Sequence, residues 1–206
     1  MADKEQILAE IEKLVKERCI DDATGHDWNH IDRVRRNSLK IAKKEGGDAF
    51  IIELAALLHD VEDWKTENYK SGIVAKWLDN YGTNKNDKQK IMNIIERISF
   101  KGTNHDDNMD SIEGKIVQDA DRLDAIGAIG LARCIAFGTS KNRTLYDPSI
   151  EPDMGMKRNT TTINHFYEKL LLLKDRMNTK TAKELAKERH EFMDMFLKQF
   201  FREWNK

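Results

Sequence analysis

The sequence has few cysteines, few prolines and no long apolar run. Its two cysteines, Cys19 and Cys134, stand far apart and outside any CxxC pattern, which argues against a disulfide framework and a zinc ribbon and indicates a reducing compartment. The charged start of the chain lacks the apolar core of a signal peptide, and no stretch reaches the length of a membrane span. We therefore expect a cytoplasmic protein with no membrane partner.

An excess of charge of one sign is also missing. The 35 basic and 36 acidic residues leave a formal net charge of −1 at pH 7. No overall field therefore draws the protein to nucleic acid or to an anionic surface, and the sequence contains no recognised nucleic-acid-binding motif. Direct nucleic-acid binding ranks last among the functions considered, and a small-molecule partner ranks first.

Proline is confined to one polar stretch, from about 138 to 160, where Pro148 and Pro152 mark the main predicted loop. Elsewhere apolar residues recur with helical spacing, and no segment alternates as a half-buried strand does. The fold class is therefore all-α. Helices are expected near residues 3–19, 28–45, 48–60, 69–81, 87–99, 112–137, 161–175 and 180–204.

The length fits one domain over residues 1–206, with a core of about 20–140 and additional C-terminal helices of about 160–204. Asp48 is expected to cap one helix, and Ser111 is expected to open another. Phe192, Phe196, Phe200 and Trp204 form an aromatic stripe at a spacing of four. Such a stripe indicates core or a dimer surface rather than a base-stacking platform, and a symmetric homodimer is the default expectation.

Four residues form an H…HD…D series: His30, the pair His59-Asp60, and Asp121. The pair closes the apolar run 54–58, so an imidazole and a carboxylate stand where a helix should enter the core. Buried polar groups need partners, and one cation can serve both. Nitrogen and oxygen donors suit one divalent ion per chain, with manganese, nickel, iron, cobalt, magnesium and zinc all open.

Each part of this series also has an ordinary explanation. His26 and His30, one turn apart, could be a surface coincidence, and His59-Asp60 could be a plain helix end. Asp121 could pair with Arg122 in an internal salt bridge. Asp121 and Asp124 border the buried face of the predicted helix, and Asp119 does not share the face of these two aspartates as well. The conjunction of all the parts favours a metal site.

Three segments carry a resemblance to a known family: 30–34 (HIDRV), 57–60 (LLHD) and 119–125 (DADRLDA). In this order they resemble the HD-domain metal-dependent phosphohydrolases. The flanking segments 98–102 and 165–179 resemble a small stand-alone bacterial branch, the YedJ/YpgQ-like proteins. The resemblance implies an HD-domain helical bundle, metal ligation by His30, His59, Asp60 and Asp121, and hydrolysis of a nucleotide phosphate or pyrophosphate linkage.

A hydrolase of this kind also needs a group that orients water and cations that meet phosphate charge. Asp63 stands where the resembling nucleotidases carry a water-orienting carboxylate, and Glu62 is the second candidate. Substrate contacts are expected from residues near these ligands or in the loop after 99. They are Arg33, Lys65, Lys101, His26 and Arg122.

The leading hypothesis is a metal-dependent nucleotide phosphohydrolase, with release of pyrophosphate from a nucleoside triphosphate as one form of it. The alternative is a non-catalytic regulatory module that uses the metal to bind a nucleotide without cleaving it. Oxygen chemistry at two irons is a third option, but the interval between His59 and Asp121 offers only His105 as an extra histidine.

Overall fold

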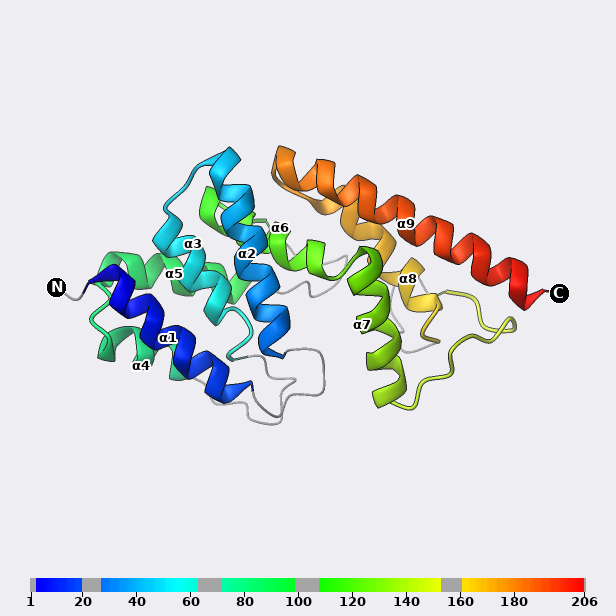
Figure 1. Cartoon of the computed structure of the whole chain (residues 1–206), viewed down its shortest axis with the longest axis horizontal. Coiled ribbons are helices and arrows are strands. Elements are labelled where there is room, and N and C mark those ends of the chain that lie inside the picture. The colour runs from blue at the N-terminus through cyan, green and yellow to red at the C-terminus, as the bar shows by residue number, and fades with distance from the viewer. Residues whose placement is uncertain (1–2, 20–26, 63–71, 99–107, 153–160, 206) are drawn as a thin grey trace. The chain divides into compact units, whose positions relative to one another are not determined.

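The structure is a computed structural model that describes residues 3–19, 27–62, 72–98, 108–152 and 161–205 (Figure 1). Within these ranges every regular element is a helix and no strand occurs, so the all-α prediction is confirmed. The elements are α1 (Lys4–Arg18), α2 (Trp28–Glu45), α3 (Ala49–Leu58), α4 (Ile73–Asn80), α5 (Lys85–Ile98), α6 (Ile112–Asp124), α7 (Gly127–Ser140), α8 (Asn164–Glu168), the 3₁₀ helix η1 (Leu170–Arg176) and α9 (Lys180–Trp204).

The chain divides into two compact units, Met1–Ala120 and Asp121–Lys206, and the division falls inside α6. The expectation of a single domain over 1–206 stays a prediction. Among the described residues no single helix is long and apolar enough to span a membrane; the bent pair α6 and α7 meets that criterion only by length and composition.

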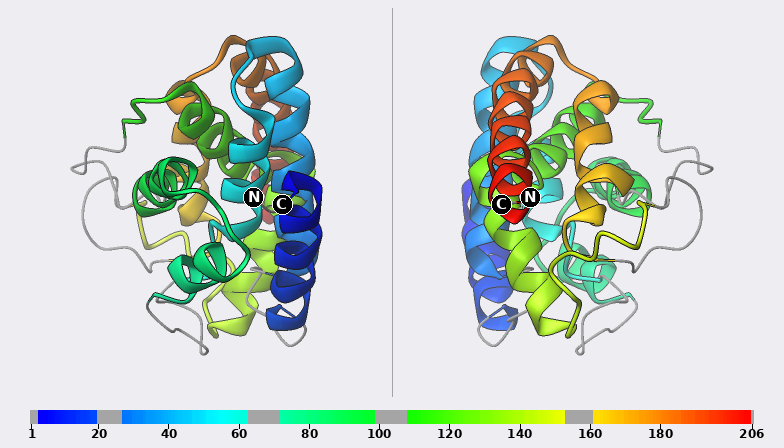
Figure 2. Two further views of the ribbon diagram at one scale, coloured as in Figure 1. Left: turned by 90° about the vertical axis from the view of Figure 1, so that its left-hand side faces the viewer. Right: turned by 90° about the vertical axis from the view of Figure 1, so that its right-hand side faces the viewer.

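The core of the first unit is built around α3. Eight of its ten residues are buried, and it packs against α1, α2 and α5 (Figure 2). Asp48 caps its N-terminus by accepting hydrogen bonds from the backbone N–H groups of Phe50 (2.9 Å) and Ile51 (3.4 Å), as predicted. Because most of its residues are apolar and buried, this helix carries its C-terminus into the interior.

A partly buried ion-pair network joins the three N-terminal helices. Arg35 of α2 binds Glu12 of α1 at 2.9 Å and Glu53 of α3 at 2.7 Å. Burial alone would lower the pKa of Arg35, but the two carboxylates outweigh it and raise that pKa. The network therefore keeps the arginine charged and fixes α2 against α3, the two helices that carry the histidines of the predicted site.

The second unit packs α9 against α7 and η1. The buried residues of α9 are Thr181, Ala182, Ala186, Met193 and Leu197. Helical spacing places Phe196 and Phe200 of the aromatic stripe beside them, and Phe196 stacks on the buried Phe166. In that stripe Phe192 is 38% exposed and Trp204 is 45% exposed. Tyr146 makes edge-to-face contacts with Phe200, Phe201 and Trp204. The stripe is thus partly a packing surface and partly open to solvent.

One predicted helix, 112–137, is wrong because the structure divides it into α6 and α7. Gly127 opens α7 with a φ of +78°, a left-handed conformation that glycine adopts without a steric penalty. A Cβ atom at Gly130 would lie 2.2 Å from the carbonyl oxygen of Ala125, so only glycine allows the approach of α7 to this turn. The predicted helix 161–175 is likewise two elements, α8 and η1.

Candidate metal centre

The central histidine and aspartate follow directly from the end of α3. His59 is the C-cap residue of that helix, with helical backbone angles, and Asp60 begins the next turn. His59 is 4% exposed, and the side chain of Asp60 is 10% exposed. The apolar run that makes α3 a core helix is therefore what buries an imidazole and a carboxylate side by side.

The second imidazole comes from the first turn of α2. Asp27 caps this helix, and its carboxylate accepts a hydrogen bond from the backbone N–H of His30 at 2.8 Å. His30 is 1% exposed. Since α2 begins at Trp28, the predicted helical pairing of His26 with His30 would need a helix that starts earlier; His26 itself lies outside the described residues.

Asp121 supplies the fourth group from α6. It is the residue after Ala120 in the continuous helix α6. One carboxylate oxygen of Asp121 and one ring nitrogen each of His30 and His59 all lie within 4.8 Å of one another. Asp121 lies on α6, within the range where the sequence predicted a helix.

Three potential ligand atoms converge closely. The Nε2 atom of His59 lies 3.3 Å from the Nε2 atom of His30 and 3.3 Å from Oδ2 of Asp60, and the Nε2 atom of His30 lies 3.2 Å from the same oxygen. Ligands about 2.1 Å from one ion are separated by about 3.0 Å at right angles and about 3.4 Å at tetrahedral angles. The observed separations fall in this range, so these residues fit a single divalent ion.

A hydrogen bond of the His59 ring determines which of its two nitrogens carries the proton. Its Nδ1 atom donates a hydrogen bond to the backbone carbonyl oxygen of Ala56 at 2.8 Å. In a neutral ring this leaves Nε2, the atom that faces His30 and Asp60, with the lone pair. A backbone carbonyl commonly orients a metal-binding histidine in this way, so the ring is prepared for a cation.

Two contacts that the sequence did not reveal hold the turn 59–62. Arg18 of α1 donates from Nε to the carbonyl oxygen of Val61 at 3.2 Å. Glu62 accepts a hydrogen bond from the backbone N–H of Val74 at 2.7 Å, at the start of α4. The N-cap residue of α4, Gly72, offers no side chain for capping, so the carboxylate of Glu62 takes that task. The Arg18 contact spans 43 positions and has no local signature.

The remaining predicted site residues are placed as follows. Arg33 lies on α2, three residues after His30, and is partly exposed. Arg122 is 5% exposed, and its guanidinium donates to the carbonyl oxygen of Arg176. Asp63, Lys65, Lys101 and His26 lie outside the described residues. The roles of all six at a substrate stay predictions.

Asp119 is buried although it lies off the face that Asp121 and Asp124 share. It is 0% exposed. Its neighbours Val117, Gln118 and Ala120 are buried as well, so this stretch of α6 is covered on every side. Apolar periodicity predicts burial only for a helix with one face in solvent, so it does not predict which residues of this helix are buried. Asp124 is also buried and pairs with Arg133 at 2.8 Å.

Cys134 offers no nucleophile for an alternative chemistry. Burial raises the pKa of its thiol to about 11, although the positive charges of Arg143 and Lys169 oppose that shift. Relative to a cysteine with the unshifted pKa of 9.0, the thiolate fraction at pH 8 should be lower by about 100-fold. We expect iodoacetamide to label Cys134 in the native protein far more slowly than in the urea-unfolded protein, as measured by mass spectrometry of the Cys134 peptide. Equal rates would show that the thiol is neither buried nor shifted.

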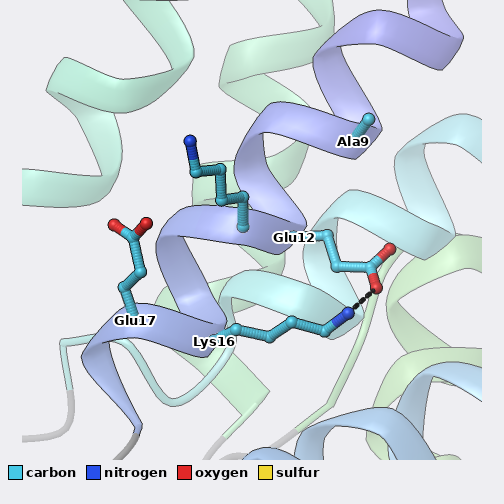
Figure 3. Close-up of a pocket in the computed structure, with 5 residues that line it drawn as sticks. Ala9, Glu12, Lys16 and Glu17 are labelled. Atoms are coloured by element: carbon cyan, nitrogen blue, oxygen red, sulfur yellow. Dashed lines mark hydrogen bonds and ion pairs between the residues drawn. The ribbon is translucent and has the colours of Figure 1, made fainter.

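A separate hollow of about 460 Å³ lies on α1, where Figure 3 shows Glu12, Lys16 and Glu17 around it. The ammonium of Lys16 pairs with Glu12 at 2.6 Å and also lies 4.6 Å from the centre of the Trp28 ring. None of the residues that line the hollow belongs to the metal centre. A pair of charged side chains such as Lys16 and Glu12 is ordinary for a helix face that is open to solvent.

Comparison with known proteins agrees with this geometry. The HD domain family matches residues 27–126, a range that includes all four predicted ligands. The uncharacterized protein YpgQ of Bacillus subtilis is 42% identical over 195 residues, which cover 92% of this chain and 90% of that protein. The chain belongs to the HD-domain family. The resemblance of the three sequence segments to this family is therefore confirmed.

Solved structures extend the relationship of this HD-domain protein over its whole length. A crystal structure of an HD-superfamily hydrolase from Bacillus thuringiensis is 44% identical, with a TM-score of 0.79, and the match covers 98% of this chain and 99% of that one. The structure of Bacillus subtilis YpgQ in complex with ADP is 40% identical, with a TM-score of 0.78, over 95% and 97% of the two chains. The similarity thus extends beyond residues 27–126 to the C-terminal helices.

Proposed function

We propose that this HD-domain protein is a metal-dependent phosphohydrolase that acts on nucleotides, with hydrolysis of a nucleoside triphosphate to release pyrophosphate as the form to test first. The observation that carries the proposal is the convergence of His30, His59 and Asp60 within 3.3 Å, with Asp121 nearby. The relative YpgQ, which has been crystallised in complex with ADP, supports a nucleotide as the ligand class.

In this proposal His30, His59, Asp60 and Asp121 hold one divalent ion, with manganese, nickel, iron, cobalt, magnesium and zinc all compatible with the donor set. When bound, such an ion supplies Lewis-acid chemistry at a phosphate and acidifies water. The chain's own task is to fix the donor atoms: Ala56 holds the His59 ring, Asp27 holds the turn of His30, and Arg18 holds the turn after Asp60.

We assign Asp63 to orienting the attacking water, because the carboxylate of Glu62 is already engaged by the N-terminus of α4. We assign phosphate recognition to Arg33, Lys65 and Lys101, with His26 and Arg122 as further contacts. The phosphate oxygens gain negative charge as the bond breaks, so these cations would act most strongly in the transition state.

The test is a screen of the metal-loaded protein against nucleoside mono-, di- and triphosphates with manganese, cobalt, nickel, magnesium and zinc, separating orthophosphate from pyrophosphate. We expect hydrolysis of at least one nucleotide that stops on chelation and returns when the metal is restored. Metal-loaded protein that leaves every nucleotide intact would refute the enzyme. If it still bound nucleotide only with metal, the regulatory binding module would be correct.

A further inference from the structure

The end of α6, where the chain turns into α7, is held by arginine side chains. Arg189 of α9 donates a hydrogen bond to the backbone carbonyl oxygen of Leu123. Arg133 of α7 binds the carboxylate of Asp124 at 2.8 Å, and its guanidinium lies 3.5 Å from the backbone carbonyl oxygen of the same residue. The predicted metal ligand Asp121 precedes these two positions by two and three residues, in the last turn of the helix.

The buried end of α6 needs such donors. The last carbonyl groups of a helix have no partner within the helix itself. Leu123 is 0% exposed and Asp124 is 1% exposed, so donors for their carbonyl groups must come from the protein. A positive side chain also interacts favourably with the negative end of the helix dipole. Arg189 and Arg133 therefore cap α6 and should keep its last turn from fraying.

The carboxylate of Asp124 ties the two arginines together. An acidic side chain at a helix C-terminus is unfavourable by itself, and a buried one needs cationic partners. Arg133 is one such partner. Burial lowers the pKa of Arg189, and the negative charge of Asp124 opposes that shift, so this carboxylate acts on Arg189 as well. Asp124 thus joins arginines from α7 and α9 at one helix end.

The turn after α6 also leaves room for the stem of Arg189. A Cβ atom at Gly127 would lie 2.9 Å from Cγ and 3.0 Å from Cβ of Arg189. A larger residue at position 127 would therefore push the arginine away. This close packing and the hydrogen bond to Leu123 are separate contacts, and both hold the same side chain at the end of α6.

We propose that Arg189 is a positioning residue of the metal centre: from α9 it caps the end of α6 and so holds Asp121 in the orientation that binds the ion. The inference rests on the proposed function, which requires that ion. Without the cap the last turn of α6 would fray, and Asp121 lies in that turn. A ligand that must be ordered on each binding event binds less tightly than one that is already fixed. In this way α9 contributes to metal binding although it carries none of the four predicted ligands.

The charge of Arg189, taken alone, predicts the opposite effect. Removal of a positive charge near a divalent cation reduces repulsion and should strengthen binding of the ion. Loss of the cap should weaken it. The direction of the change in metal affinity therefore distinguishes a positioning role from a purely electrostatic one.

The test is Arg189→Met, which keeps an apolar stem beside Gly127 but cannot donate to Leu123. The ion is the one that the parent binds most tightly among manganese, cobalt, nickel, magnesium and zinc. Equilibrium dialysis of the full chain should show its dissociation constant raised by about tenfold. In the metal-free protein, hydrogen exchange followed by mass spectrometry should be faster in a peptide that covers 117–126. Arg189→Lys keeps a donor and the charge, so it should restore most of the affinity and of the protection.

Two variants on α9 provide matched controls. Leu197→Ala opens a cavity at the buried face of α9, two turns after Arg189. It should lower the thermal unfolding temperature without changing metal affinity. Arg202→Met removes an exposed arginine from the same helix and should change neither quantity.

The outcomes separate this inference from the proposed function. If Arg189→Met bound the ion as tightly as the parent, or more tightly, the positioning role would be overturned while the metal centre stood. The same holds if Leu197→Ala weakened binding as much, because a general loss of stability would then explain both variants. A parent that binds none of the five ions refutes the metal centre, and the role of Arg189 with it.

Discussion

His59→Asn should remove the metal while leaving the fold in place. Asparagine can present its side-chain amide near the position of Nδ1, so the hydrogen bond to the carbonyl oxygen of Ala56 can persist. The Nε2 lone pair that faces His30 and Asp60 is lost. Loss of a group that only orients a ligand typically costs about 10- to 100-fold in metal affinity, so loss of the ligand itself should cost more than about 100-fold. Nucleotide hydrolysis should fall with it.

The measurement is bound metal after equilibrium dialysis, by elemental analysis, together with the thermal unfolding curve of the metal-free protein. His190→Ala is the control, because His190 lies on α9 and pairs with Asp194 at 3.5 Å, on a helix that carries none of the four ligands. That variant should keep its metal. If His59→Asn retained one ion with the parent's affinity, the four-residue metal centre would be incorrect.

Asp63→Asn should lower kcat by about 10²- to 10⁴-fold with little change in KM, because the amide keeps the size of the side chain but cannot take a proton from water. Metal content should stay at one ion per chain, since Asp63 is not among the four ligands. The measurement is steady-state hydrolysis of the nucleotide identified in the screen, with bound metal determined on the same sample.

Glu62 provides the matched control for this experiment. Glu62→Gln keeps an oxygen that can accept the hydrogen bond from Val74, so it should fold and turn over substrate as the parent does. Glu62→Ala loses that oxygen and should destabilise the start of α4 by about 1 kcal/mol. If Glu62→Gln were inactive and Asp63→Asn active, the roles of the two carboxylates would be exchanged.

The sequence predicted the helices with strong apolar spacing and recognisable caps. The range 28–45 is α2 as observed, and 180–204 is α9, because each begins after a capping residue, Asp27 and Thr179. The break between α6 and α7 was missed since Ala125 and Ile126 do not disfavour a helix. It depends on the close approach of Gly130 to the Ala125 carbonyl oxygen, which single-residue propensities do not encode.

The candidate metal centre could be proposed from the sequence because its residues stand in distinctive local settings. An apolar run that ends in His59-Asp60 is conspicuous, and so is Asp121 beside a buried stripe. The contacts that stabilise the centre could not be predicted in the same way. Arg18 reaches Val61 across 43 positions, and Glu62 binds the backbone of a later helix. Pairings of this kind arise only once the chain has folded, and many arginines could have made them.

The hydrogen bond from His59 to the carbonyl oxygen of Ala56 makes this centre tolerant of substitutions in α3. Every amino acid carries that oxygen, so no exchange of the side chain at position 56 deletes the acceptor as long as the helix persists. The backbone therefore determines which ring nitrogen of His59 is left to face the ion. Divergence within the helix can alter packing, and with it metal preference, without first destroying the ligand.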